Sequence, residues 1–305
     1  MTTNKSYPFK NIGIETTSSC NSKCLVCVRE EHYKQPVITM SMDLFKKIII
    51  DIHDNHLEEI TRFSGMGDPS CDPLLIERLR FCKDRAPDLK IGIQTNMAIW
   101  KNSFTDAVVE EQLLKNIRFS VLAVTENASK RVYGNPAQAD EARKSIEYFI
   151  EKNNNAGHPV QTMIYTLLLK DYDGELDRIK YTYWDLADEF EVWRPHTWSD
   201  RMPELRALQQ ERRICPQINN FSACIRVNGD LCACSLDINH EIVYGNLQQQ
   251  SLMEIYESPR YKELKELNLA GRIESLPSCL NCTYLNASQD DVLVELKAGT
   301  KDRRV

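Results

Sequence analysis

The stretch Cys20-Asn21-Ser22-Lys23-Cys24-Leu25-Val26-Cys27 places three thiols within eight residues, directly after an alternating segment, 12–17, that is typical of a short strand. A cubane iron–sulfur cluster normally has four cysteine ligands, so three thiols would leave one iron open to a small molecule. A helix that buries the cysteines as small hydrophobic residues fits less well, because polar residues separate them. A zinc site usually pairs two CxxC units, and no second unit lies nearby. The stretch therefore predicts an open iron–sulfur cluster.

The composition is that of a globular protein. The 305 residues are 42% hydrophobic and 27% charged, enough for one large or two modest domains. The net charge of −6 and the pI of about 5.6 argue against a nucleic-acid partner. The first ten residues contain no apolar targeting segment, and no apolar run is long enough to span a bilayer, so we predict a cytoplasmic protein with no membrane partner. The eleven cysteines are clustered, which in such a chain indicates metal ligands rather than disulfides.

Strand-like and helix-like segments alternate over the first two thirds of the chain. After the segment 12–17, the hydrophobic pattern predicts strands over 59–64, 90–95, 117–124, 160–169 and 189–193. It predicts helices between them over 41–52, 73–84, 104–115, 139–153 and 173–188. This alternation calls for parallel strands joined by right-handed crossovers, and six such units make an α/β fold of the partial (β/α)6 TIM-like barrel type. We expect the functional groups on the loops that follow the strands.

The alternation stops near residue 198, which divides the chain into three predicted parts. Residues 1–198 form the barrel, and residues 199–290 form a small cysteine-rich domain with one clear helix over 251–267. Residues 291–305 end in a polar tail, which we expect to be disordered.

The second part contains its own set of thiols: Cys215, Cys234, Cys279 and Cys282. Four thiolates saturate one [4Fe–4S] cluster and leave no open iron. A structural zinc site uses the same number of cysteines, so the spacing alone leaves both metals open. Cys224 and Cys232 lie in a strand-like region with the hairpin turn Asn228-Gly229, and either could replace one of the four ligands.

A glycine-rich loop, Ser64-Gly65-Met66-Gly67-Asp68-Pro69, ends the second predicted strand. Glycines allow a close backbone approach and positive φ, which suits a loop that lies against a ligand. Its backbone groups, with Asp68, could bind a cationic amine. The hexapeptide by itself also fits an ordinary turn between a strand and a helix.

These motifs together resemble the radical S-adenosylmethionine (radical SAM) superfamily with a C-terminal SPASM/twitch domain. The CxxxCxxC loop at the end of the first strand resembles the superfamily signature, although Val26 stands where an aromatic residue is usual. Four motifs in the second part, in this order, resemble the shorter twitch form: Cys-Pro, Asn228-Gly229-Asp230-x-x-x-Cys, Gly245-Asn246-Leu247 and Leu276-Pro277-x-Cys-x-x-Cys. The resemblance implies two [4Fe–4S] clusters and SAM as cofactors, with a flavodoxin- or ferredoxin-type electron donor.

The resemblance also implies which residues contact SAM. The glycine-rich loop takes the place of a GGE-type motif that binds the SAM amino group, with Asp68 where Glu is common. The implied SAM-binding residues are Gly65, Met66, Gly67, Asp68, Thr95, Asn96, Ser120 and Arg131. Ser120 and Arg131 could equally be solvated surface residues.

The expected activity is that of a radical SAM oxidoreductase, which cleaves SAM reductively to a 5′-deoxyadenosyl radical that abstracts hydrogen from a substrate. Resemblance to twitch enzymes favours a two-electron dehydrogenation of a sugar- or aminocyclitol-type small molecule. The alternatives are epimerisation with Cys71 as hydrogen donor, modification of a ribosomal peptide, and a non-enzymatic iron–sulfur or zinc binding module. His196, after the sixth strand, is a candidate substrate contact or proton shuttle, or a structural residue between domains.

Overall fold

The computed structural model describes residues 11–55, 61–170, 174–198, 201–205, 214–219, 222–276, 278–280, 282, 285 and 293–297. In these residues ten strands form one sheet in the order β10-β6-β5-β4-β3-β2-β1-β7-β8-β9. The first six strands are β1 Asn11–Ile14, β2 Thr61–Phe63, β3 Ile91–Thr95, β4 Asn116–Ser120, β5 Gln161–Leu167 and β6 Glu189–Trp193. They run parallel to one another in sequence order, as the predicted barrel requires.

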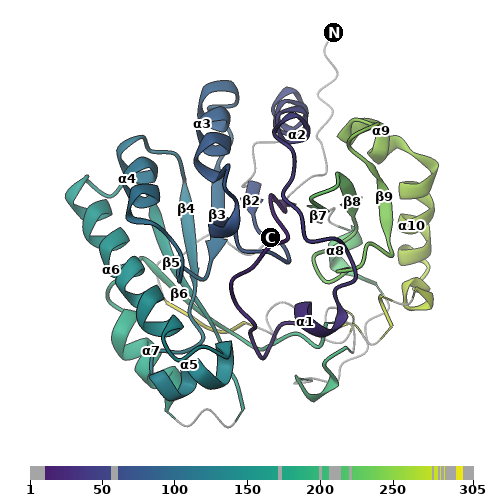
Figure 1. Cartoon of the computed structure of the whole chain (residues 1–305). Coiled ribbons are helices and arrows are strands. Elements are labelled where there is room, and N and C mark those ends of the chain that lie inside the picture. The colour runs from purple at the N-terminus through teal and green to yellow at the C-terminus, as the bar shows by residue number, and fades with distance from the viewer. Residues whose placement is uncertain are drawn as a thin grey trace.

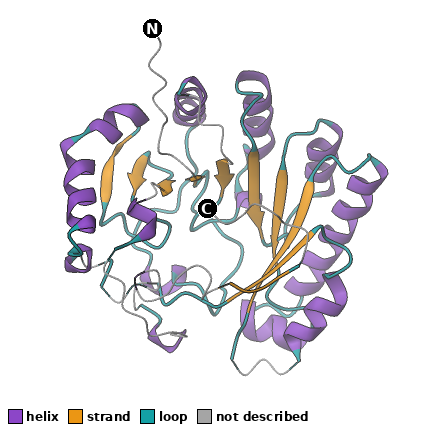
Figure 2. Ribbon diagram, turned by 180° about the vertical axis from the view of Figure 1, so that it is seen from behind, coloured by secondary structure: helices purple, strands orange, loops and turns teal. Residues whose placement is uncertain are grey.

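Helices connect these strands and cover one face of the curved sheet (Figures 1 and 2). The connecting helices are α1 Arg29–His32, α2 Met42–Asp54, α3 Leu75–Arg85, α4 Asn102–Glu110, α5 Glu126–Tyr133, α6 Gln138–Asn155 and α7 Glu175–Tyr183. Helix α5 did not stand out in the sequence, and the other long helices lie where the hydrophobic pattern predicted them. Within the described residues, no helix is both long enough and apolar enough to cross a membrane.

The core lies between the sheet and these helices. Ser41 begins α2 by accepting a hydrogen bond at Oγ from Leu44 N at 3.2 Å, and the stripe that follows (Leu44, Phe45, Ile48, Ile49 and Ile52) is buried. Alternate strand residues, such as Ile93, Ile117 and Phe190, are fully buried toward the helices. Each such side chain stabilises the fold by about 1.5–3 kcal/mol. The intervening residues of β3 to β6 therefore point to the inner face of the barrel.

The C-terminal part extends the same sheet. The strand β7 Ser222–Ile225 pairs in parallel with β1, and β8 Asp230–Cys232 and β9 Val243–Asn246 continue it with antiparallel pairing. The helix α8 Pro216–Asn219 precedes β7. The domain boundary near residue 198 stays a prediction, because hydrogen bonds join the two parts through this sheet.

The single helix predicted over 251–267 is wrong. The chain forms two helices, α9 Leu252–Glu257 and α10 Pro259–Leu269. Ser258 separates them, because its side chain accepts from Tyr261 N at 3.1 Å and Pro259 occupies the first turn of α10.

The expectation of a disordered tail over 291–305 is also wrong in part. Leu293–Leu296 form β10, which pairs antiparallel with β6 and covers the edge of the barrel sheet. Lys297 adds hydrogen bonds from Nζ to the carbonyls of Trp184 and Ala187, each 2.7 Å. Residues 298–305 lie outside the described part.

Candidate active site

The three-cysteine loop lies at the carboxyl edge of the parallel strands and is held from three sides. Leu25 N donates to Val132 O of α5 at 2.7 Å. Asn96, just after β3, donates from Nδ2 to Asn21 Oδ1 at 2.9 Å. Trp198 donates from Nε1 to Val26 O at 2.8 Å, although its φ of 52° is unusual for a bulky residue. These contacts fix the position of the loop at this edge of the sheet.

The thiols of this loop are partly buried and close enough to influence one another. Burial raises the pKa of Cys20 to about 12, with further contributions from the charges of Asp68, Cys71 and Cys27. Burial also raises the pKa of Cys24, with smaller contributions from the charges of Cys27 and Cys20. Burial raises the pKa of Cys27 as well. Buried thiolates need a compensating positive charge, which bound iron would supply. The three thiols therefore fit the predicted cluster.

Val26 is only 8% exposed and packs in an apolar cluster with Leu122, Val132 and Tyr133. In this chain the residue before the third cysteine therefore contacts protein, which accounts for a small aliphatic side chain at that position.

The glycine-rich loop lies against the start of the cysteine loop. An added Cβ at Gly67 would lie 2.2 Å from Thr17 O and 2.5 Å from Ser19 O, and one at Gly65 would lie 2.5 Å from Glu15 Cγ. Neither glycine has positive φ, so of the two properties that glycine allows, this loop uses the close approach. These glycines are required because the loop packs closely on the chain's own backbone and side chains.

Asp68 ties this loop to the end of β3. Its carboxylate accepts from Thr95 Oγ1 at 2.9 Å and from Asn96 N at 2.7 Å, and it also accepts from Ser70 N at 2.9 Å. The structure thus brings Asp68, Thr95 and Asn96 together next to the cysteine loop, and the direct contact of Asp68 with a SAM amino group stays a prediction. Met66 is 5% exposed and packs with Val28.

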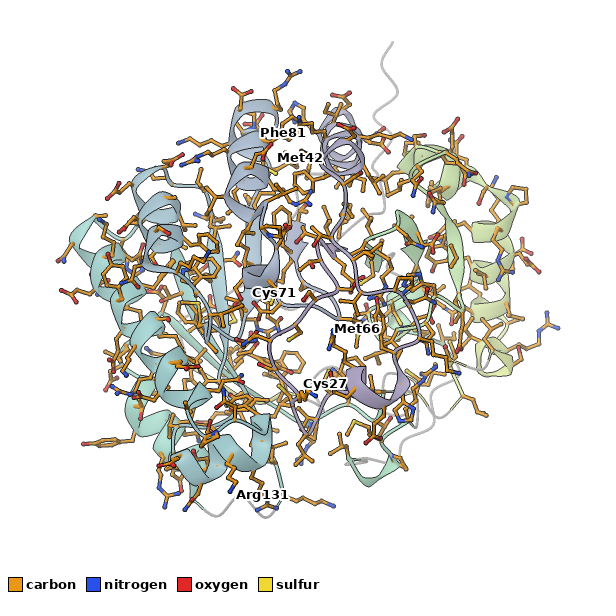
Figure 3. The ribbon with its side chains drawn as sticks, viewed as in Figure 1. Cys27, Met42, Met66, Cys71, Phe81 and Arg131 are labelled. Atoms are coloured by element: carbon orange, nitrogen blue, oxygen red, sulfur yellow. The ribbon has the colours of Figure 1, made fainter. Side chains whose placement is uncertain are left out.

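Ser120 and Arg131, the other implied SAM-binding residues, differ in their surroundings. Ser120 ends β4 on the inner face and accepts at Oγ from Gln94 Nε2 at 3.3 Å. Arg131 is exposed on α5, next to Val132, and Figure 3 shows it at the lower edge of the molecule, away from Cys71 and Met66. Their roles toward SAM remain predictions.

The inner face of the barrel is polar around Arg118. Its guanidinium pairs with Glu191 and lies 4.2 Å from the centre of the Tyr165 ring. Glu191 also accepts from Trp193 Nε1 at 2.9 Å. Arg118 Nε is buried and has no hydrogen-bond partner among the described residues. This wall can donate to and accept from a polar molecule in the barrel.

Cys71 lies beside the cysteine loop, and His196 lies next to Trp198, which donates to that loop. Cys71 Sγ is 4.0 Å from Asn21 Oδ1, and Figure 3 shows Cys71 in the middle of the molecule with Cys27 and Met66. Burial and then the charge of Asp68 raise the pKa of Cys71, which favours the S–H form. Burial lowers the pKa of His196 to about 4, so its imidazole is neutral at pH 7. Its ring meets that of Trp198 edge-on at 6.4 Å.

The structure brings together the four thiols of the second set: Cys215, Cys234, Cys279 and Cys282. Burial raises the pKa of Cys234, and the charges of the other three thiols and of Asp237 raise it further. Cys215 is fixed by Asn268, which accepts from Cys215 N at 2.7 Å and donates to Cys215 O at 3.0 Å. Four thiols gathered in this way, three of them buried, fit one closed cluster.

Cys224 and Cys232 lie outside this set. They face each other across β7 and β8, and the positive charge of Arg226 lies near both. Across the described residues, no group of three or more His, Cys, Asp or Glu side chains is arranged to hold one metal ion. A cubane cluster binds each thiolate through a different iron, so its ligands need not converge on one ion.

Sequence reasoning missed several residues that organise the site. Glu15 and Asn268 hold the loops through hydrogen bonds to the backbone N–H groups of Met66 and Cys215. Arg226 is 1% exposed and donates to backbone carbonyls around Cys234. A charged residue inside an apolar strand pattern, as at Glu15 and Arg226, was the available signal.

Residues 215–283 match the SPASM family, described as an iron–sulfur cluster-binding domain, and this range contains all four thiols of the second set. The match shows that the chain carries a C-terminal SPASM domain, as the motifs predicted, and this domain follows a parallel barrel whose three-cysteine loop resembles the radical SAM signature. The predicted iron–sulfur character of the C-terminal part is thereby confirmed.

Several known proteins are similar over most of the chain. A crystal structure of BtrN in complex with AdoMet and 2-DOIA superposes with a TM-score of 0.65 and 15% identity, covering 94% of this chain and 98% of that one. Native anSMEcpe with bound AdoMet gives a TM-score of 0.64 and 12% identity, covering 85% and 83%. The tungsten-containing aldehyde ferredoxin oxidoreductase cofactor-modifying protein of Pyrococcus furiosus is 22% identical, covering 91% of this chain and 88% of its own length. The two solved structures confirm the predicted fold class.

Proposed function

We propose that the protein is a radical SAM oxidoreductase that removes two electrons and two hydrogens from a sugar- or aminocyclitol-type small molecule. The observation that carries this proposal is the pair of thiol sets. Three thiols lie at the carboxyl edge of the barrel, next to the glycine-rich loop, and four lie together in the SPASM region, three of them buried. When bound, the cluster and SAM supply a 5′-deoxyadenosyl radical able to abstract hydrogen from an unactivated C–H bond.

The residues of this chain would bind and orient the reactants. Cys20, Cys24 and Cys27 would hold the open cluster on a loop that Asn96 and Trp198 already fix. The glycine-rich loop and the Thr95–Asn96 turn would hold SAM beside it, with Asp68 keeping the two segments in register. The cysteine loop and the segment that ends at Trp198 would exclude water from the barrel mouth.

The polar inner wall supports a hydroxylated substrate. The Arg118–Glu191 pair carries no net charge, and the Ser120 hydroxyl and the buried Arg118 Nε offer separate hydrogen-bonding groups. The similar BtrN structure also contains a small molecule, 2-DOIA, along with AdoMet. Both points favour a small polar substrate over a large apolar one.

The second set of thiols would complete the oxidation. Four cysteine ligands leave no iron for SAM, so the group they hold would accept the second electron from the substrate while a proton leaves to solvent. A flavodoxin- or ferredoxin-type protein would supply the first electron. We place the reaction in the cytoplasm, where thiols stay reduced.

Epimerisation with Cys71 as hydrogen donor is a second candidate. Cys71 lies beside the cysteine loop, and its raised pKa keeps the S–H bond that a substrate radical would need. A peptide substrate is a third, since anSMEcpe has also been solved with bound AdoMet and Cp18Cys peptide, at a TM-score of 0.54.

Turnover in deuterated water separates these candidates. The reconstituted protein would be incubated with SAM, reductant and panels of aminocyclitols, sugars and peptides. The product masses would be measured by mass spectrometry after exchangeable deuterium is washed out. Dehydrogenation predicts a product about two mass units lighter, with one SAM consumed per product. A product one unit heavier, with a deuterium on carbon, would establish epimerisation and refute dehydrogenation.

A further inference from the structure

A buried ion pair joins the barrel to the SPASM region where β1 meets β7. Glu15 and Arg226 are 2% and 1% exposed, and Arg226 Nη1 lies 3.8 Å from Glu15 Oε1. The backbones of the two parts are also hydrogen-bonded at this point, where Glu15 N donates to Ile225 O at 2.8 Å. Removing one partner of such a pair leaves an uncompensated buried charge. The two charges therefore depend on each other.

Glu15 reaches from this pair to the glycine-rich loop. Its Oε1 accepts from Met66 N at 2.6 Å, and its side chain fills the space where a Cβ of Gly65 would stand. The Met66 side chain packs in turn with Val28 and Ile238, so one loop residue contacts the cysteine loop and the SPASM region together. A shift of Glu15 would move the backbone of the loop that we assign to SAM.

Arg226 reaches in the opposite direction, to the loop of a cluster ligand. Its Nη2 donates to the carbonyls of Cys234 at 3.3 Å, Ser235 at 3.2 Å and Asp237 at 2.7 Å. Asp237 accepts from Ser278 Oγ at 3.3 Å, next to the ligand Cys279. Arg226 therefore organises the backbone around the four-thiol set.

The geometry of this pair is not that of an optimal ion pair. Glu15 Oε2 and Arg226 Nε are both buried and have no hydrogen-bond partner within the described residues. Such groups cost stability, and an apolar pair of similar volume would often be as stable. The pair instead connects two loops to which we assign different ligands: the glycine-rich loop, for SAM, and the loop of Cys234, for the second cluster.

We infer that Arg226 is a positioning residue that couples SAM binding to the redox state of the SPASM cluster, through Glu15 and Met66 on one side and Cys234 on the other. The inference rests on the proposed function. Coupling is reciprocal, so bound SAM shifts the midpoint potential of the second cluster as much as the state of that cluster shifts SAM affinity. The protein would thus bind SAM with an affinity that depends on whether the electron acceptor is oxidised.

An anaerobic redox titration followed by electron paramagnetic resonance, with and without SAM, tests this coupling. The signal of the second cluster is identified by its loss in Cys279→Ala/Cys282→Ala. We expect SAM to shift its potential in the wild type by about 59 mV, equivalent to a ten-fold change in SAM affinity for one electron. The shift should vanish in Arg226→Met and return in part in Arg226→Lys.

The matched control is Arg260→Met, which removes an exposed arginine of α10 that pairs only locally with Glu263. It should keep the full shift. If Arg226→Met does not retain iron, Glu15→Gln/Arg226→Met removes both buried charges and should also lose the shift. An unchanged shift in an Arg226 variant that holds both clusters overturns the inference. Wild-type protein that binds SAM with no shift also overturns it, whereas a failure to bind SAM refutes the proposed function.

Discussion

The two thiol sites differ in how the chain assembles them. The first takes all its cysteines from one loop, and each of these thiols is partly exposed. The second collects cysteines from three separate segments between residues 215 and 282, and Cys215, Cys279 and Cys282 are buried while Cys234 is partly exposed. A local, accessible set suits a site that must admit a ligand, whereas a dispersed, mostly buried set suits one that only exchanges electrons. The difference between the sites is therefore one of access as well as of ligand number.

The largest expected effect comes from removing the first site. Replacing Cys20, Cys24 and Cys27 with Ala should abolish SAM cleavage and remove about half the iron, because a cubane cluster contributes about four irons. Iron assay and chromatography of 5′-deoxyadenosine measure both. Cys82→Ala is the control, since Cys82 is a buried residue of α3 that belongs to neither set. SAM cleavage by the triple variant would show that the first site is not the one that acts on SAM.

Removing the second site should have a different outcome. Cys279→Ala/Cys282→Ala should also lose about half the iron, yet keep SAM cleavage, because the first site is complete without it. Substrate oxidation should stop. The melting temperature should fall, since both side chains are buried. Complete loss of SAM cleavage in a variant that keeps half its iron would show that the sites do not have separate tasks.

A change in the glycine-rich loop tests the access of SAM to the first site and leaves the second site unchanged. Gly67→Val would place a side chain where Thr17 O and Ser19 O now lie, so the loop must move away from the cysteine loop. We expect SAM affinity to fall about ten-fold or more, with the iron of the second site unchanged. Ala156→Val, at an exposed position after α6, is the control. Unchanged SAM affinity in Gly67→Val would remove this loop from the site.

The smallest effect expected on the thiol sites is an indirect one, through the pH dependence that His196 gives to the free energy of unfolding. Burial lowers the pKa of His196 from 6.5 to about 4, so the unfolded chain binds a proton between these values while the folded chain does not. Stability is therefore complete above about pH 6.5 and falls as the pH drops toward 4, by roughly 3 kcal/mol at most. Urea titrations at several pH values would measure it, and His196→Gln should flatten this part of the profile. An equal slope in that variant would rule out His196 as its source.

The sequence predicted most of the barrel and the first thiol set, because those features depend on local patterns. Alternating apolar residues locate strands such as β3 and β6, and short cysteine spacings locate the first three thiols, whereas the dispersed second set was grouped by its resemblance to the twitch form. The break before α10 was missed because the residues on both sides of it are helix-forming, and only the pair Ser258-Pro259 indicates it.

Contacts between distant segments could not be predicted in the same way. The Glu15–Arg226 pair and the pairing of β10 with β6 join residues far apart in the chain, and no local pattern specifies the partner. The predicted role of Asp68 illustrates the same limit. Its position next to the glycines suggests a ligand contact, which stays a prediction, whereas the hydrogen bonds that its carboxylate accepts from Thr95 and Asn96 at the end of β3 could not be read from the sequence.

Metal content after anaerobic reconstitution is the most direct test of the central claim, that one open and one closed iron–sulfur site coexist in this chain. Elemental analysis of the wild-type protein should give about eight irons and eight sulfides per chain, with no stoichiometric zinc. About four irons together with one tightly held zinc, lost on replacing Cys279 and Cys282, would contradict it, because the four-thiol site would then be structural and unable to accept an electron.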